Sequence, residues 1–260
     1  MKQQAQTTPQ HKKFPKPLKI VLICVAGAIA LFGIVFAIDR LAFNGTLFSR
    51  QDNSHHDSRE IPEYCKGNVG KEDCWKYLDV YKPIIYLYPE EETEISVKLG
   101  SPEKLTTVYP KYNNGWHVLA EPNGKLTDLS TGRELYALYW EGKDATYHQT
   151  AEGFVVKGSD TASFLEEKLA ILGLNYKEAE EFIVYWLPKL EKNSYNYIRF
   201  ASSEEINIYM SLSVTPQPDT TIRIMMIWRS LDKPIDVTEQ KLETPTRTGF
   251  TVVEGGGSEL

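Results

Sequence analysis

Residues 20–38 read IVLICVAGAIALFGIVFAI, a run of 19 residues without a charged side chain. An α-helix rises about 1.5 Å per residue, so a helix of this length measures roughly 28 Å, close to the roughly 30 Å hydrocarbon core of a bilayer. Backbone amides inside hydrocarbon must be satisfied within the segment, which favours a helix there. The sequence therefore predicts a single transmembrane helix that begins at Ile20 and ends at Ile38.

Lysines flank this run on its N-terminal side only. Residues 1–19 contain five lysines and no Asp or Glu, whereas residues 39–60 are close to neutral. Such an asymmetry is typical of a cytoplasmic N-terminus, so we expect a single-pass membrane protein with everything after residue 38 extracytoplasmic. The alternative is a cleaved signal peptide, with Val35 and Ala37 as small residues of the cleavage site. The length of the apolar run favours an uncleaved anchor.

Small residues form a stripe along the predicted helix, at Ala26, Ala30, Gly33 and Ala37. A stripe of this kind lets two membrane helices approach closely, which would allow a weak homodimer. Ala and Gly are also common in spans that do not associate. The sequence thus predicts the lipid bilayer as a partner around Ile20 to Ile38, and the small-residue stripe allows a second copy of the helix as another partner.

The charge of the chain changes sign after the apolar run. The formal net charge is −6 and residues 1–38 carry +5, so the remaining residues carry −11. A strongly acidic domain argues against nucleic acid as a partner. Residues 39–60 are polar and predict a flexible stalk. We expect one extracytoplasmic domain at residues 61–254 and a flexible tail at 255–260.

Two of the three cysteines, Cys65 and Cys74, follow the stalk closely. Outside the cytoplasm neighbouring cysteines usually pair, and closing this short loop would stabilise the fold by about 2–3 kcal/mol. A structural zinc site normally needs four ligands, and no second Cys or His pair lies nearby. We therefore predict a disulfide, no metal and no cofactor.

Strand patterns cover most of the chain from Lys82 onward. Alternation or short apolar runs indicate strands at residues 84–88, 95–99, 116–120, 134–140, 195–200, 212–215 and 222–228. A helical period replaces this pattern between residues 161 and 190. The first half of the domain is therefore expected to be mostly antiparallel sheet.

The helical region contains clear end signals. Asp160 is placed to cap a first helix and Gly173 to end it, while Asn175 and Glu178 form a capping box for a second helix. Pro188 should kink or end the second helix. Together these patterns predict an α+β fold, with a transmembrane helix followed by an antiparallel sheet and a helix pair packed on it.

Residues 82–89 read KPIIYLYP and resemble the opening signature of a family of bacterial and fungal KPxIYLYP domains of uncharacterised function. Further blocks are similar to later parts of that family, namely residues 138–141, 153–156, 182–188, 212–216 and 249–254. In the family, the residue matching Glu254 is often followed by Trp-Gly-Gly, whereas Gly255 stands at the Trp position here. The resemblance implies a shared fold over most of residues 82–254 and no activity.

No diagnostic catalytic spacing is present, because the sequence lacks His-Glu-x-x-His, Gly-x-Ser-x-Gly and a phosphate-binding Gly-rich loop. Glu90 and Glu141 are the stronger candidates, since each lies at the predicted end of a strand. Two carboxylates of this kind could act as acid and nucleophile in glycoside cleavage. The residues that could present flat ring faces to a sugar are Tyr86, Tyr88, Trp116 and Trp140.

A simpler interpretation places Glu90 in a solvated turn and the aromatic rings in the core or in cross-strand pairs. The sequence therefore favours a membrane-anchored binding domain for an envelope glycan or a protein. A carboxylate-dependent extracytoplasmic hydrolase is the alternative. The two differ in geometry, because the hydrolase needs two carboxyl groups roughly 5–10 Å apart in an aromatic cleft.

Overall fold

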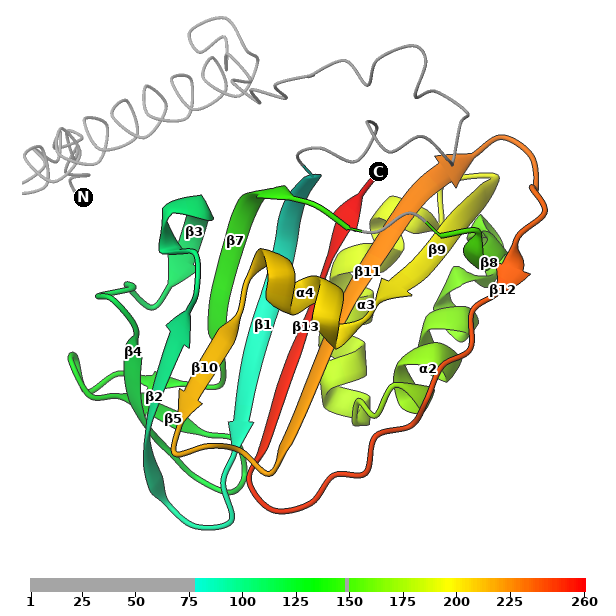
Figure 1. The fold of residues 1–260 in the computed structure, drawn as a ribbon. Coiled ribbons are helices and arrows are strands. Elements are labelled where there is room, and N and C mark those ends of the chain that lie inside the picture. Colours follow the sequence, from blue (N-terminus) through cyan, green and yellow to red (C-terminus); the bar gives the residue numbers. More distant parts are fainter. Residues whose placement is uncertain (1–77, 148–149) are drawn as a thin grey trace, which may run out of the picture. The chain divides into compact units, whose positions relative to one another are not determined.

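The computed structural model describes residues 78–147 and 150–260, and two β-sheets dominate them (Figure 1). The larger sheet has the strand order β12 (Thr238–Glu239), β8 (Glu152–Lys157), β9 (Tyr195–Ala201), β11 (Thr220–Leu231), β13 (Thr251–Glu259), β1 (Leu78–Tyr88), β7 (Leu138–Ala145) and β3 (Leu105–Tyr109). The smaller sheet has the order β10 (Leu212–Thr215), β2 (Thr93–Leu99), β4 (Trp116–Ala120), β5 (Leu126–Asp128) and β6 (Glu134–Leu135). Most neighbours are antiparallel, but β11 pairs with β13 in parallel, as β12 does with β8.

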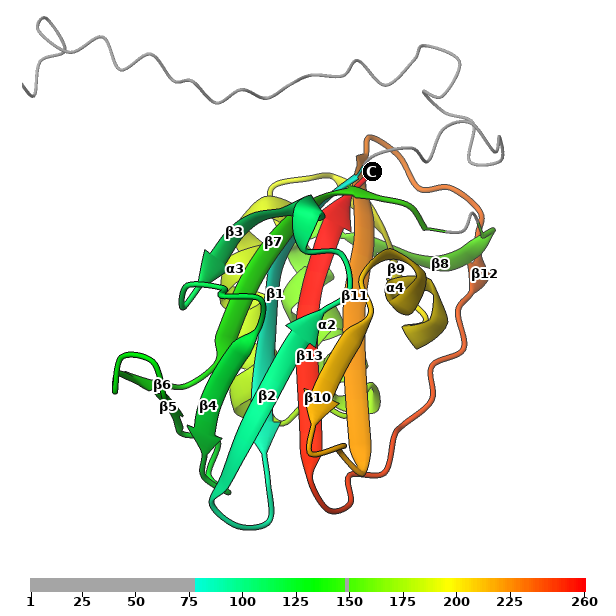
Figure 2. The same ribbon diagram turned by 60° about the vertical axis from the view of Figure 1, so that its left-hand side comes forward.

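The sheets and helices form three layers (Figures 1 and 2). The smaller sheet packs on one face of the larger sheet, and helices α2 (Thr161–Ile171) and α3 (Tyr176–Leu190) pack on the other face. A short helix, α4 (Ser203–Tyr209), lies on the same side as the smaller sheet. Two 3-10 turns, η3 (Pro102–Lys104) and η4 (Gly158–Asp160), precede β3 and α2.

Strand β1 contributes to both hydrophobic cores. Ile85 and Leu87 point into the core between the sheets, whereas Ile84 and Tyr86 point into the core under the helices. Both faces of the strand are therefore buried, and a strand buried on both faces reads as a continuous apolar run instead of an alternating one. This burial explains the uninterrupted sequence IIYLY.

The helix ends follow the sequence signals closely. Asn175 accepts from the backbone amide of Glu178 at 3.0 Å, and the Glu178 carboxylate accepts from the Asn175 amide at 2.9 Å, which confirms the predicted capping box. Gly173 has φ +88°, as a residue that ends a helix in the left-handed region should. Asp160 lies at the predicted N-cap position of α2 but makes no side-chain capping hydrogen bond, and α3 does not end at Pro188 but continues to Leu190.

The predicted α+β class is also wrong. The described residues are mostly β-sheet in two sheets, and the helices form only one thin layer. Three strands of the smaller sheet were predicted, at residues 95–99, 116–120 and 212–215, but alternation within a strand does not show which sheet the strand joins. The second sheet, and with it the sandwich, was therefore missed.

The predicted membrane and disulfide features receive no support from the structure and are corrected accordingly. None of the helices within residues 78–147 and 150–260 combines the length and the apolar content needed to cross a bilayer. The same residues contain no cysteine and hence no disulfide. The expected tail, span, stalk and disulfide, at residues 1–19, 20–38, 39–60, Cys65 and Cys74, lie outside the described residues, and the predicted localisation stays a prediction.

The predicted flexible tail is a central strand instead. Residues 251–259 form β13, which pairs with β1 on one side and β11 on the other. Its glycines allow close neighbours, since a Cβ on Gly256 would lie 2.9 Å from the backbone nitrogen of Pro83. A Cβ on Gly257 would lie 2.7 Å from the ring of Trp186. The Gly-rich sequence therefore reflects tight packing.

Candidate functional site

A bulge in β1 brings Lys82 out of the regular ladder. The register of β1 with β13 shifts between Tyr81 and Ile84, and Lys82 has φ +55°, a left-handed conformation that is uncommon for a residue other than glycine. Pro83, which cannot donate to a ladder, lies inside the bulge. Unusual backbone conformations of this kind concentrate at functional sites, which makes the surroundings of Lys82 a candidate functional site.

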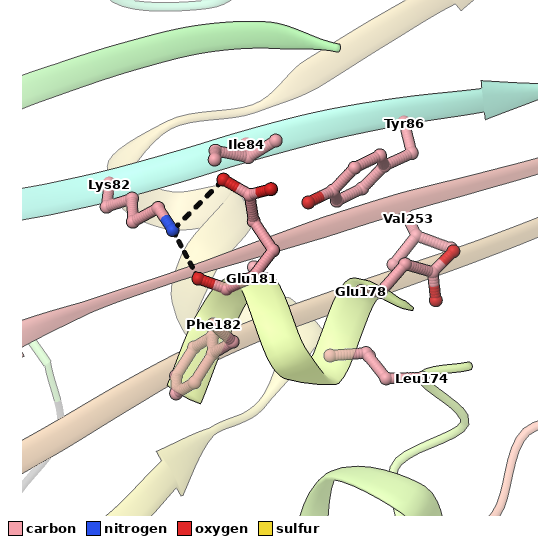
Figure 3. Close-up of a pocket in the computed structure, with 9 residues that line it drawn as sticks. Lys82, Ile84, Tyr86, Leu174, Glu178, Glu181, Phe182 and Val253 are labelled. Atoms are coloured by element: carbon pink, nitrogen blue, oxygen red, sulfur yellow. Dashed lines mark hydrogen bonds and ion pairs between the residues drawn. The ribbon is translucent and has the colours of Figure 1, made fainter. Parts of the chain in front are cut away.

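The Lys82 side chain joins the bulge to helix α3 (Figure 3). Its Nζ donates to the backbone carbonyl of Glu181 and lies 3.3 Å from Glu181 Oε1. Burial lowers the pKa of the Lys82 ammonium from its usual value, and the charge of Glu181 offsets part of that effect. The ion pair therefore links the strand with the third layer of the fold.

A small cavity lies beside this ion pair, between β1, β13 and α3 (Figure 3). Its lining mixes apolar and charged side chains: Lys82, Ile84, Tyr86, Leu174, Glu178, Glu181, Phe182, Val253 and Gly255. The space open to the centre of a water molecule is about 10 Å³, which is roughly what a single water occupies. A ligand larger than water would therefore bind on the open surface next to the cavity.

Glu141 on β7 lies near three tyrosines whose pKa values are raised by burial and, to a lesser extent, by its charge. Glu141 Oε1 accepts from the backbone amide of Lys82 at 3.4 Å, and Tyr139 precedes Glu141 by two residues on the same face of β7. Burial, with Asp79 and Glu141 as further causes, raises the pKa of Tyr81 to about 12. Burial and then Glu141 also raise the pKa values of Tyr139 and Tyr185. All three hydroxyls therefore stay protonated at neutral pH and can donate.

Two further tyrosines extend this surface towards the edge of the larger sheet. Tyr109 on β3 lies directly opposite Tyr139 on β7 and is 47% exposed. Tyr136, which is 52% exposed, donates from its hydroxyl to Glu181 Oε1 at 3.2 Å. We call Tyr81, Tyr109, Tyr136, Tyr139 and Tyr185 the tyrosine surface.

This surface is open to solvent only in part. Tyr81, Tyr139 and Tyr185 are partly buried against the core under the helices. On β3, at the edge of the larger sheet, Val108 packs towards the smaller sheet, so its neighbours Thr107 and Tyr109 point to the opposite, helix-bearing face, and both are exposed. Tyr109 and Tyr136 are therefore accessible from solvent, and the other three tyrosines are accessible in part.

A separate charged cluster closes the other end of the cavity. Arg247 Nη2 lies 2.7 Å and 2.8 Å from the two oxygens of Glu178, whose side chain is fully buried. The Arg247 guanidinium also lies over the Tyr88 ring, 5.6 Å from its centre. Because Glu178 also completes the capping box, this cluster fixes the start of α3 against the chain that leads into β13. Its role is structural.

The structure separates the residues that the sequence suggested. Tyr86 lines the cavity and Tyr88 lies in the adjacent cluster, while Glu141 lies at the centre of the tyrosine surface. Glu90 is exposed in the turn after β1. The seven residues of β1 from Lys82 to Tyr88 span roughly 20 Å, so Glu90 and Glu141 do not form a carboxylate pair.

The two predicted tryptophans belong to the core between the sheets. Trp116 is 2% exposed and donates from Nε1 to the Pro110 carbonyl at 2.8 Å. Trp140 is fully buried and donates to Glu254 Oε1 at 2.8 Å. Neither ring presents a face to a ligand.

Sequence reasoning missed Lys82, Glu181 and all five residues of the tyrosine surface. Lys82 belongs to the KPIIYLYP block, and Tyr185 and Tyr139 belong to other blocks that resemble the same family. Their positions in these blocks were a sequence signal that could have grouped Lys82, Tyr139 and Tyr185 in one site. Their spacing carried no information, because the bulge and the packing of α3 bring them together.

The described residues hold no group of three His, Cys, Asp or Glu side chains that could bind a metal ion. The fold and the site define a mostly β, three-layer protein with an open face of tyrosines around a carboxylate and a lysine–glutamate pair. Hydroxyl donors, carboxylate acceptors and flat rings on one surface are suited to binding a polar ligand.

Comparison with known proteins places the chain in a family. An uncharacterized protein in the bglA 3′ region of Butyrivibrio fibrisolvens is 43% identical over 79 residues, which make up 29% of this chain and 79% of that protein. The chain therefore belongs to the same family as this protein. No family model and no solved structure matches the chain.

Proposed function

We propose that the chain is a binding domain that holds a glycan on the tyrosine surface. The observation that carries the proposal is the position of Glu141, which accepts from the Lys82 amide at 3.4 Å and lies on β7 next to β3, where Tyr109 is 47% exposed. Carboxylates accept hydrogen bonds from sugar hydroxyls, and tyrosine rings offer apolar faces beside a polar tip.

Binding is favoured over cleavage by the same geometry. Glu141 and Glu90 lie too far apart to act together, and Glu181, the other carboxylate near Lys82, is engaged by an ion pair and by the Tyr136 hydroxyl. Among the described residues, the cavity beside Lys82 has room for about one water molecule, too little to enclose a sugar. These features support a surface that recognises a chain of sugars without reacting with it.

A glycan array probed with the full-length protein tests this proposal, followed by titration calorimetry with the glycans that bind. Replacing Tyr109 or Tyr136 by Ala should weaken binding by roughly three- to tenfold, since each removes one exposed ring. Tyr176→Ala is the matched control, because Tyr176 is 85% exposed at the start of α3, more than one helical turn before Glu181. Absence of glycan binding, or an equal loss with Tyr176→Ala, would contradict the proposal.

A further inference from the structure

We infer that the glycan held by the tyrosine surface carries a free amino group, which binds as an ammonium beside Glu141. The inference rests on the proposed function and names the chemical class of its ligand. It follows from the charges at the site, from the aromatic rings around them and from the ammonium groups that the chain itself places there.

Glu181 and Glu141 are balanced differently. Glu181 pairs with the Lys82 ammonium at 3.3 Å, and Asp79, a third carboxylate near these tyrosines, accepts from the Tyr81 hydroxyl at 3.3 Å. Within residues 78–147 and 150–260, no Lys, Arg or His side chain lies within 4.0 Å of the Glu141 carboxylate. Glu141 accepts from the Lys82 backbone amide at 3.4 Å, a group that carries no formal charge. Among the described residues the Glu141 carboxylate therefore has no ion pair, and it can attract a cation.

The rings next to Glu141 already accept ammonium groups. Lys82 Nζ lies 5.3 Å from the centre of the Tyr185 ring, and Lys189 Nζ lies 5.1 Å from it. Both distances fall within the range of a cation–π interaction. Tyr185 also lies in the field of Glu141, so an ammonium group of a ligand bound beside Glu141 would lie near a ring that already attracts the ammonium groups of two lysines.

The charge of the whole domain points the same way. The residues after 38 carry a formal charge of −11, which attracts cations and repels acidic glycans. A sugar with a free amino group combines the ammonium that Glu141 and Tyr185 favour with the ring faces that suit Tyr109 and Tyr139. A neutral sugar would leave the Glu141 charge unbalanced.

Three four-sugar probes with the same β-1,4 linkage separate the contributions. They are a glucosamine tetramer with free amino groups, its fully N-acetylated form, and cellotetraose, which has hydroxyl groups at these positions. We expect the full-length protein to bind the amino form roughly tenfold more tightly than the other two in titration calorimetry. Added salt should weaken that preference.

Two charge variants locate the effect. Glu141→Gln keeps the size and a carbonyl acceptor but removes the charge, so it should abolish the roughly tenfold preference and make the affinities for the amino form and for cellotetraose equal. Glu90→Gln removes the same charge from the exposed turn after β1 and should leave the preference intact. Circular dichroism of both variants checks that they are folded.

The outcomes distinguish the inference from the function on which it rests. Equal binding of all three sugars, with loss in Tyr109→Ala, would overturn the amino-group inference and keep the glycan-binding function. Binding of tetralysine as tightly as the amino sugar would overturn the inference as well, because the site would then read the ammonium group without the sugar. Binding of none of the sugars would overturn both proposals.

Discussion

Breaking the buried pair of Arg223 and Glu254 should destabilise the fold far more than removing both charges together. Arg223 Nε donates to Glu254 Oε2 at 2.6 Å, and the side chains are 2% and 0% exposed. Glu254→Gln keeps the size of the side chain and an oxygen that can accept from Trp140. The guanidinium would remain buried without its counter-charge, which costs about 3–5 kcal/mol of the free energy of unfolding.

The double variant Arg223→Met with Glu254→Leu should recover most of that loss. It removes the desolvation penalty of both charges and keeps apolar volume between the sheets. It leaves Trp140 Nε1 without its acceptor, and it leaves unpaired the Asn207 oxygen and the Met210 carbonyl, which accept from Arg223 Nη1 at 2.6 Å and 2.8 Å. We therefore expect the double variant to fall within about 2 kcal/mol of the wild type.

Urea unfolding of the full-length chain, followed by circular dichroism, measures both free energies. A domain of this size is stable by about 5–15 kcal/mol, so Glu254→Gln would remove a large fraction of its stability. Its melting temperature should fall by about 6–20 °C. A Glu254→Gln variant within 1 kcal/mol of the wild type would refute the reasoning, as would a double variant no more stable than the single one.

Three further predictions concern other parts of the fold. Gly257→Ala should destabilise the fold by about 1–3 kcal/mol in urea unfolding, because its Cβ would lie 2.7 Å from a ring carbon of Trp186. Gly255→Ala places its Cβ at an ordinary 3.4 Å and should be tolerated, so equal stability of the two variants would contradict this prediction. Arg247→Met leaves the buried Glu178 carboxylate without its cation and should cost about 3 kcal/mol, measured in the same way, and a loss below 1 kcal/mol would argue against a structural pair. Burial raises the pKa of Tyr81 from 10.0 to about 12, so its protonation contributes to the free energy of unfolding fully below pH 10, and this contribution is lost as the pH rises towards 12. Tyr81→Phe should therefore make the free energy of unfolding fall less between pH 10 and pH 12. An unchanged pH profile would contradict the shift.

Local chemistry was the most predictable part of this molecule. The capping box of Asn175 and Glu178 follows from two residues three apart, and the structure has it. Strands β4 and β10 begin and end where alternation predicted, at Trp116–Ala120 and Leu212–Thr215. In each case the deciding interaction lies within a few residues of sequence.

Features set by distant contacts could not be read in this way. Gly255, Gly256 and Gly257 read as a flexible tail because the neighbours that require them, Pro83 and Trp186, are far away in sequence. The prediction of which residues belong to the site failed for a related reason. Trp140 and Glu141 are adjacent, but alternation sends one into the core and the other to the open face, and the sequence does not show which face is open.

The position of β13 has a consequence for the making of the protein. Its Thr251 pairs with Tyr88, which the ribosome adds 163 residues earlier. At about 5–20 residues per second, β1 waits roughly 10–30 s for this partner after its own synthesis. During that interval the nascent chain presents an apolar strand with one edge unfilled, the kind of segment that chaperones cover. Completion of the larger sheet is therefore an event that follows translation of its last strand.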